Sequence, residues 1–190
     1  FSEDRAASEA EPAACGFWQG KKLVVTAGPT YEPVDPVRFL GNRSSGAMGY
    51  ALASAAVGGG AEVTLISGPV ALTPPRGLAL FKGVESAEEM SQAVGENLSA
   101  GADWLIMAAA VADFKPATFA SGKLKKDVLG TSWSLDMTRN PDILGEIVPR
   151  HATGGLKVVG FALETEDAVL RATLKRDAKG DYLRVLKASL

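Results

Sequence analysis

The chain has 190 residues, of which 46% are hydrophobic and 22% are charged. This length and composition are enough for one α/β domain with a buried core, and the formal net charge of −2 gives no electrostatic reason to expect nucleic acid or a membrane surface as a partner. Cys15 is the only cysteine, which excludes an internal disulfide, and no apolar run approaches the ~18 residues of a membrane-spanning helix. We therefore expect a cytoplasmic protein.

Residues 1–19 are rich in alanine, glutamate and serine and are predicted to be a disordered linker. From residue 20 the pattern becomes regular. It predicts strands over 23–28, 61–67, 103–111 and 157–163, alternating with helices over 45–57, 86–99, 141–149 and 165–179. Ser86 is predicted to cap the second helix, and Asn140 the third, with Pro141 in its first turn. The alternation predicts an α/β fold, a single domain over 20–190 with a Rossmann-like, doubly wound, mostly parallel sheet.

A turn rich in small residues precedes the first helix, with the pattern Ser-x-Gly-x-x-Gly at residues 44–49. Such a helix start binds anions, because its first N–H groups lack partners and the helix dipole adds positive charge. Ser44 and Ser45 are candidate helix caps or phosphate ligands, and Gly46 is a candidate phosphate contact through its backbone; the alternative is a tight helix entry without a ligand. The loop is long for a dinucleotide fold, and the next strand ends at Ser67 without a ribose-binding acid. The stretch predicts a nucleotide rather than NAD.

The segments that follow the other strands are the next candidates, because ligands bind beyond the carboxyl ends of parallel strands. Residues 28–38 carry three prolines and Arg38, which indicates either a rigid surface loop or an arm that reaches Asn42. The partly apolar excursion 29–43 is also a predicted dimer contact. The small side chains of 108–112 leave room for a flat ligand, with Asp113 as an acceptor for a ribose or base. The alternative is close helix–sheet packing by alanines.

Several further positions can be interpreted either as structural or as functional. Lys123 leads a run of three lysines in four residues, which is either a solvated loop or a phosphate contact. Lys175 and Lys179 lie on one helix face and form either an exposed surface or a clamp for a triphosphate. Residues 140–144 offer a second helix N-terminus. His151 lies where a helix ends, which favours an interaction with the helix dipole over a catalytic role. The sequence does not support triad hydrolysis, a zinc site or a P-loop.

Six ordered motifs connect these stretches to a known family. They are Thr26-Ala27-Gly28-Pro29-Thr30 with Asp35-Pro36-Val37-Arg38, Asn42-Arg43-Ser44-Ser45-Gly46-Ala47-Met48-Gly49, Ala108-Ala109-Ala110-Val111-Ala112-Asp113-Phe114, Lys123-Leu124-Lys125-Lys126, Asn140-Pro141-Asp142-Ile143-Leu144 and Val159-Gly160-Phe161-Ala162-Leu163-Glu164-Thr165. Together they resemble bacterial phosphopantothenoylcysteine synthetases, the ligase domain of bifunctional coenzyme A biosynthesis proteins. The resemblance implies a homodimer that uses CTP and Mg²⁺ to join 4′-phosphopantothenate to cysteine through an acyl-cytidylate, with release of pyrophosphate and CMP.

The resemblance also implies roles for individual residues. Cytidine contacts are implied at Met107, Ala108, Ala109, Asp113, Pro141, Asp142, Ile143, Leu144 and Phe161. Triphosphate contacts are implied at Lys123, Lys175 and Lys179, and phosphopantothenate contacts at Arg38, Asn42 and Ala109. Lys123 and Asn42 are the expected catalytic residues, because departing pyrophosphate needs positive charge and aminolysis needs a neutral donor near the acyl oxygen. We expect no protein metal ligand, since magnesium would be carried on the phosphates.

Two departures from the family pattern shape the expectation. Residues 180–190 match neither the strand with an Asn-Asp segment nor the glycine-rich flap of the family, which predicts a domain incomplete at its C-terminus. In bacteria the domain commonly follows a flavin-dependent decarboxylase, and because only the linker-like stretch 1–19 stands there, FMN is not expected. Two other functions stay open: an oxidoreductase, supported by the pattern at 44–49, and a non-catalytic nucleotide-binding regulator, which would not need Lys123 or Asn42.

Overall fold

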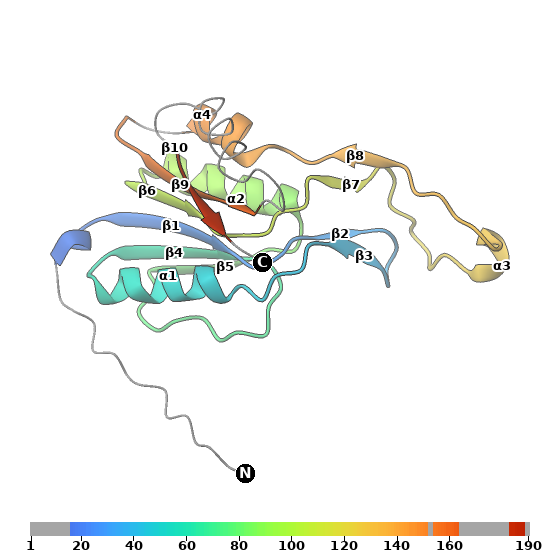
Figure 1. Ribbon diagram of the computed structural model, residues 1–190, viewed down its shortest axis with the longest axis horizontal. Helices are drawn as coiled ribbons and strands as arrows, with labels where there is room; N and C mark the ends of the chain where they lie inside the picture. Colours follow the sequence, from blue (N-terminus) through green and yellow to red (C-terminus); the bar gives the residue numbers. More distant parts are fainter. Residues whose placement is uncertain (1–15, 152–153, 164–182, 189–190) are drawn as a thin grey trace, which may run out of the picture.

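The structure is a computed structural model that describes residues 16–151, 154–163 and 183–188. Its centre is one six-stranded sheet with the order β10-β9-β6-β1-β4-β5 (Figure 1). The strands are β1 (Lys22–Ala27), β4 (Glu62–Ser67), β5 (Leu80–Gly83), β6 (Trp104–Met107), β9 (Lys157–Leu163) and β10 (Leu183–Ala188). Every pairing in this sheet is parallel. The order is that of a Rossmann-like, doubly wound sheet, which confirms the predicted fold class.

Helices cover the two faces of the sheet, α1 (Ala47–Gly58) on one and α2 (Ala87–Ser99) on the other (Figure 1). Successive residues of a strand point to opposite faces, so Leu23 and Val25 pack under α1 while Val24 packs under α2. A short helical turn, η1 (Gly16–Trp18), precedes β1. A π-helical turn, η2 (Ile143–Ile147), and α4 (Val148–His151) complete the α2 side.

The capping box predicted at Ser86 is present at the start of α2. The Ser86 hydroxyl accepts from the Glu89 N–H at 3.2 Å, and the Glu89 carboxylate accepts from the Ser86 N–H at 3.4 Å. These two bonds satisfy N–H groups that the first turn of a helix leaves unpaired, so this boundary is encoded locally.

Two antiparallel hairpins project from one end of the sheet (Figure 1). The first pairs β2 (Tyr31–Pro33) with β3 (Phe39–Gly41), and the second pairs β7 (Phe114–Pro116) with β8 (Met137–Arg139) and carries α3 (Lys126–Leu129) in its connection. We call residues 31–41 and 114–139 the arm. Its first hairpin is fixed to the body by the Tyr31 N–H, which donates to Glu85 O at 2.8 Å, and by the buried Glu32 carboxylate, which accepts from the Ala87 N–H at 3.0 Å.

Several predicted boundaries were wrong. The strand predicted over 103–111 stops at Met107, because the segment after it forms hydrogen bonds with side chains as well as with neighbouring backbone. The helix predicted over 141–149 begins as a π turn capped by Asp142, whose carboxylate accepts from the Gly145 N–H at 2.9 Å; Asn140 is not the cap. The cap of α1 is Gly46, with φ of 76°, rather than either preceding serine.

Other elements were missed by the sequence prediction. The edge strand β5, both hairpins and α3 were not predicted. No strand was predicted over residues 183–188, which form β10 and pair with β9 from Leu183–Val158 to Ala188–Leu163. The helix predicted over 165–179 lies outside the described residues.

Candidate functional site

The chain order reverses between β1 and β6, which are neighbours in the sheet although β4 and β5 come between them in the sequence. In doubly wound sheets ligands bind at such a switch point, outside the carboxyl ends of the strands, and we call the group of residues that meet there the crevice. The residues that meet there come from the end of β1, the start of α1 and the segment after β6. These are the stretches that the sequence motifs singled out.

Backbone segments approach one another closely where α1 and the end of β4 meet the end of β1. A Cβ atom on Gly49 would lie 2.5 Å from the Cβ of Ala27, so α1 packs directly on β1. A Cβ on Gly68 would lie 1.6 Å from Pro29 O, which brings the ends of β1 and β4 together. Gly49 therefore has the role of the third glycine of a nucleotide fingerprint, which is close helix–strand packing.

The anion site was predicted at the start of α1. Gly46 adopts φ of 76°, and its N–H donates to the Ser44 hydroxyl at 3.2 Å. The N–H of Ala47 donates to the Ser45 hydroxyl at the long distance of 3.4 Å. Both serines thus hold the first N–H groups of the helix in place, and an incoming anion would replace these hydroxyls as their acceptor.

The segment after β6 is held by two threonines from the end of β1 and the residues beyond it. The Thr26 hydroxyl donates to the Met107 sulfur at 3.6 Å and accepts from the Ala109 N–H at 3.2 Å. The Thr30 hydroxyl accepts from the Ala112 N–H at 2.9 Å. Both threonines are fully buried, so these bonds are shielded from water. The alanine-rich segment is consequently a rigid wall of the crevice.

Two side-chain amides bind the carbonyl groups of the same segment. Asn42 donates through Nδ2 to Val111 O at 2.9 Å and to Ala110 O at 3.4 Å. Asn140, only 8% exposed, donates to Ala112 O at 2.9 Å, and its own Oδ1 is buried and finds no hydrogen-bond partner among the residues that the structure describes. The structure therefore brings Asn42 to the segment that contains Ala109, as expected for a shared site, but its amide protons point to backbone carbonyls.

The other predicted nucleotide contacts divide between the two faces of the sheet. Met107 and Ile143 are buried in the core beneath α2, and Ala109 and Leu144 pack against it. Phe161 packs on the opposite core, beneath α1, so it does not join this group. Ala108 and the predicted contacts Pro141 and Asp142 are half-buried, whereas Asp113 is exposed and accepts from the Asn140 N–H through its carbonyl at 2.9 Å. Lys175 and Lys179 lie outside the described residues.

Lys123 lies on the arm rather than beside the glycine turn. The next residue, Leu124, donates its N–H to the Asp35 carboxylate at 3.1 Å, and its carbonyl accepts from Arg38 Nη2 at 2.6 Å. Asp35 and Arg38 belong to the turn of the first hairpin, so this joint ties the two hairpins together. Lys123 itself is exposed.

The joint is centred on the buried Asp35 carboxylate. It accepts the N–H groups of Val37 and Arg38 at 2.8 Å each, and the Arg38 guanidinium lies 3.6 Å away. Burial raises the pKa of this carboxyl, but the hydrogen bonds from Val37, Leu124 and Arg38 together with the Arg38 charge outweigh burial and hold the pKa below its ordinary value of 3.8. Asp35 is therefore ionised at neutral pH.

His151 ends α4 and its Nδ1 lies 2.9 Å from the Ser99 hydroxyl, on the surface away from the crevice. No group of three metal-ligating side chains occurs among the residues that the structure describes. None of the helices described combines the length and the apolar composition that a bilayer crossing requires.

The sequence reasoning gave Thr26 and Thr30 no individual role at the site, and it placed Asn140 only at a helix start. A signal existed for Thr26, because it is a polar residue directly after the apolar run 23–25, at the end of the strand where ligands bind. The partner of each of these side chains lies more than 25 residues away in the chain, and sequence spacing does not reveal such pairs.

The chain is similar in sequence to proteins of known families. The family described as DNA/pantothenate metabolism flavoprotein C-terminal domain matches residues 18–186. The coenzyme A biosynthesis bifunctional protein CoaBC of Mycobacterium bovis is 47% identical over 178 residues, which are 89% of this chain and 42% of that protein. The CoaBC of Bacillus subtilis is 50% identical over 161 residues, 85% of this chain and 38% of that protein. The chain thus spans less than half the length of these relatives.

Two solved structures have the same fold as this chain. The C-terminal domain of a CoaBC protein superposes with a TM-score of 0.70 at 40% identity, covering 85% of this chain and 74% of that one. A Cab2 mutant in complex with phosphopantothenate-cysteine superposes with a TM-score of 0.75 at 19% identity, covering 90% of this chain and 73% of that one. The second likeness concerns the fold alone.

Proposed function

The chain belongs to the family of DNA/pantothenate metabolism flavoprotein C-terminal domains, and we propose from this membership that it is a CTP-dependent ligase that joins 4′-phosphopantothenate to cysteine in coenzyme A biosynthesis. The observation that carries the proposal is the convergence of Asn42, Ala109 and the glycine turn at one crevice. A site for an acyl nucleotide needs an anion site, a surface for a flat base and a donor near the acyl group. We propose that the crevice supplies all three, with the anion site at the glycine turn and the donor at Asn42.

The reaction is proposed to proceed in two half-reactions. The carboxylate of phosphopantothenate attacks the α-phosphorus of CTP, which forms an acyl-cytidylate and expels pyrophosphate. The amine of cysteine then attacks the acyl carbon; CMP leaves, the amine loses a proton and the amide forms. Holding the acyl group and the nucleotide in one crevice makes the first attack effectively unimolecular.

The phosphates are proposed to lie at the start of α1, where Ser44, Ser45 and Gly46 present hydroxyl and N–H groups. Lys123 would reach them when the arm moves toward the crevice, and Arg38, which binds Leu124 O in the structure, would bind phosphopantothenate. Mg²⁺ is proposed to be carried on the phosphates rather than on protein ligands, because Mg²⁺ is usually bound through substrate phosphates and few carboxylates. The ion would neutralise phosphate charge during pyrophosphate departure.

Asn42 is the proposed oxyanion donor of the second half-reaction. Its bond to Val111 O is 2.9 Å, but its bond to Ala110 O is 3.4 Å, and a substrate oxygen that gains negative charge would compete well for that second proton. The shorter bond would keep the side chain aimed at the crevice during this exchange.

The first experiment measures pyrophosphate release with each nucleoside triphosphate, with and without phosphopantothenate. We expect release that requires phosphopantothenate and favours CTP over ATP. Calorimetric titration with NAD(H) is the control: tighter binding of NAD(H) than of CTP would favour the oxidoreductase alternative. Binding of CTP without turnover in a full-length protein would favour a non-catalytic regulator.

The second experiment separates the half-reactions with Asn42→Asp in a full-length version of the protein. The carboxylate keeps the size of the side chain but repels the developing oxyanion, so the acyl-cytidylate should accumulate after a pyrophosphate burst, with little CMP once cysteine is added. If both half-reactions fall together, or if neither does, Asn42 shapes the segment after β6 and is not the donor.

We also propose that the arm mediates a homodimer. Its first hairpin exposes Val37, Phe39 and Leu40, and its second exposes Phe114, Phe119, Trp133 and Met137. Apolar side chains concentrated on one projection favour burial against a second copy. Light scattering should give the mass of a dimer at micromolar concentration; a monomer would contradict the proposal. A flavin-dependent decarboxylase domain is the proposed fusion partner upstream.

A further inference from the structure

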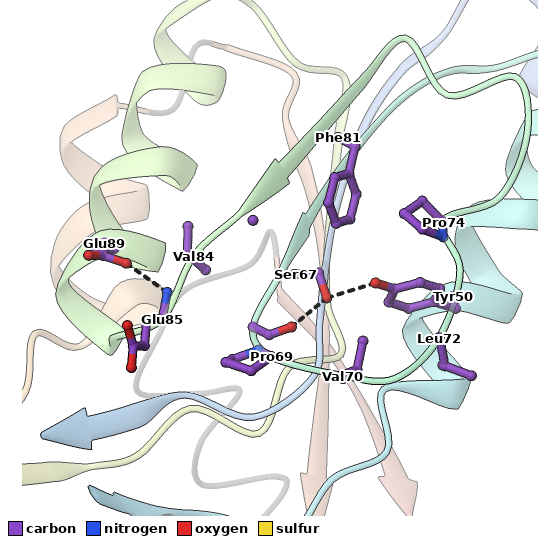
Figure 2. Close-up of a pocket in the computed structure, with 12 residues that line it drawn as sticks. Tyr50, Ser67, Pro69, Val70, Leu72, Pro74, Phe81, Val84, Glu85 and Glu89 are labelled. Carbon is purple, nitrogen blue, oxygen red and sulfur yellow. Dashed lines mark hydrogen bonds between the residues drawn. The ribbon is translucent and has the colours of Figure 1, made fainter. Parts of the chain in front are cut away.

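A second hollow lies beside the crevice, beyond the carboxyl ends of β4 and β5 (Figure 2). Its volume is about 510 Å³, within the ~300–1,000 Å³ typical of small-molecule sites. Apolar walls come from Val70, Leu72 and Pro74 on the loop after β4, and from Phe81 on β5. The sequence motifs did not single out this loop, and the proposed ligase reaction does not use it.

Two hydroxyl groups that line this pocket form a short hydrogen-bonded chain that ends at a backbone carbonyl. Tyr50 Oη donates to Ser67 Oγ at 3.1 Å, and Ser67 Oγ donates to Gly68 O at 2.8 Å. Both hydroxyl protons are therefore directed to protein atoms, as the dashed lines in Figure 2 show. A ligand carboxylate or phosphate would find no hydroxyl donor here, whereas a ligand N–H group would find the oxygen lone pairs.

The two ends of the pocket differ in charge. Glu85 and Glu89 lie at one end, and Tyr50 and Pro74 lie at the other (Figure 2). The Glu89 carboxylate is held by the Glu85 N–H at 2.6 Å, and the Glu85 side chain is exposed. None of the residues found to line this pocket is basic. One end is therefore apolar and aromatic, and the other attracts positive charge.

We propose that this pocket is a second small-molecule site, which binds a flat apolar ring that carries a cationic group. The ring lies between Phe81 and the loop residues Val70 and Pro74, where apolar contact is available, and the cation lies toward Glu85. An anion of the same shape is disfavoured by both glutamates. The site goes beyond the proposed ligase function, because its ligand is neither a nucleotide nor a phosphorylated acid.

The pocket shares a wall with the anion site of the crevice. A Cβ atom on Gly46 would lie 2.9 Å from Val70 Cγ1, and one on Gly28 would lie 3.0 Å from it, so Val70 packs directly on the glycine turn. The Tyr50 N–H also donates to Gly46 O at 3.1 Å, in the first turn of α1. A ligand in this pocket therefore contacts Val70 and Tyr50, the two residues that hold Gly46 in place. Its binding alters the position of Gly46 at the helix start where the anion is proposed to bind.

The test titrates the ¹⁵N-labelled chain with benzamidine, benzamide and benzoate, which share one ring and carry a positive, neutral and negative group. We expect amide shifts at Val70, Gly83 and Glu85, a smaller shift at Gly46, and affinity that falls from benzamidine through benzamide to benzoate. Benzoate binding as tightly as benzamidine, or shifts scattered away from these residues, would overturn the proposal. The readout is binding, so it is independent of whether the chain is a ligase.

Two variants locate the ring and the cation. Gly83 is two residues from Phe81 on the same side of β5, and a Cβ there meets no atom closer than 3.9 Å, so Gly83→Val fills the pocket with little strain. We expect it to abolish the benzamidine shifts. Glu85→Gln should weaken benzamidine by about threefold, the size of one exposed ion pair, and leave benzamide unchanged.

Glu88→Gln is the matched control, because it removes a carboxylate charge three residues from Glu85, in the first turn of α2, but that carboxylate binds Lys115 outside the pocket. It should change neither affinity. A folded Gly83→Val that binds benzamidine like the wild type would overturn the proposal. If Gly83→Val does not fold, equal effects of Glu85→Gln and Glu88→Gln would overturn it instead.

Discussion

The crevice and the arm are held together by different forces. At the crevice, backbones pack with no room for a side chain, and the strands behind it contribute fully buried residues such as Val25 and Leu65. The arm has three-residue strands, leaves Val37 61% and Phe39 50% exposed, and depends on the buried carboxylates of Asp35 and Glu32. Few buried apolar contacts imply low local stability, so the arm is the region suited to move onto a ligand.

The largest effect is expected at the crevice, from Gly49→Val. A Cβ at this position would lie 2.5 Å from the Cβ of Ala27, and α1 would have to leave β1. We expect a loss of about 3 kcal/mol in the free energy of unfolding, the upper range for overpacking, measured by chemical denaturation. Gly122→Val on the arm is the control, since a Cβ there meets nothing within 4 Å, and equal losses would contradict the difference between the regions.

Lys123→Ala tests whether the arm contributes to chemistry. Lys123 is exposed, so its removal should leave stability unchanged while slowing formation of the acyl-cytidylate on the order of 10²-fold, as for the loss of one preorganised donor. Single-turnover pyrophosphate release is the measurement. His151→Ala, at a helix end bonded to Ser99, should have little effect. Near-wild-type pyrophosphate release from Lys123→Ala would indicate that the lysine run that Lys123 leads is a solvated loop without a role in the reaction.

Asp35→Asn should loosen the joint between the hairpins. The amide cannot accept all the N–H groups that the carboxylate binds, so we expect hydrogen exchange at Val37, Arg38 and Leu124 to be faster by on the order of tenfold, with exchange in β1 unchanged. Glu88→Gln, at an exposed ion pair with Lys115, is the control. Unchanged protection at all three amides would show that the joint does not depend on the charge.

The pH dependence of the same joint follows from the lowered pKa of Asp35. A carboxyl with a lower pKa in the folded state stabilises the fold above its ordinary value of 3.8, and that stabilisation is lost as the pH falls through the lowered pKa. Protection of Leu124 should thus be flat near neutrality and fall only in acid, where the wild type should approach Asp35→Asn.

The smallest effect is expected from Glu32→Gln, where the arm meets α2. The carboxylate is 1% exposed and accepts the Ala87 N–H at the start of that helix. The glutamine keeps an acceptor but loses the charge that interacts with the helix dipole, so we expect about 1 kcal/mol of destabilisation by thermal unfolding. Glu85→Gln, an exposed neighbour of the same helix start, should cost less; a larger cost there would contradict the assigned role of Glu32.

Much of the fold was predictable from local patterns. The alternation of apolar runs and helices predicted the doubly wound sheet, and the Ser86–Glu89 spacing predicted a capping box that is present. The hairpins were not predictable in the same way, because three-residue strands such as β2 and β7 have too few positions to show a period. β5 is an exposed edge strand in which all four residues are exposed, so it lacks the buried, apolar run of a central strand.

The sequence by itself determined the order of the elements and the residue types at the crevice, because periodicity, capping and glycine turns depend on neighbours in the chain. Only the tertiary structure decided which of those residues meet. Asn42 and Val111, Thr30 and Ala112, and Asp35 and Leu124 are each more than 60 residues apart. Phe161, although part of a matching motif, lies on the other face of the sheet, since alternate residues of a strand point to opposite sides.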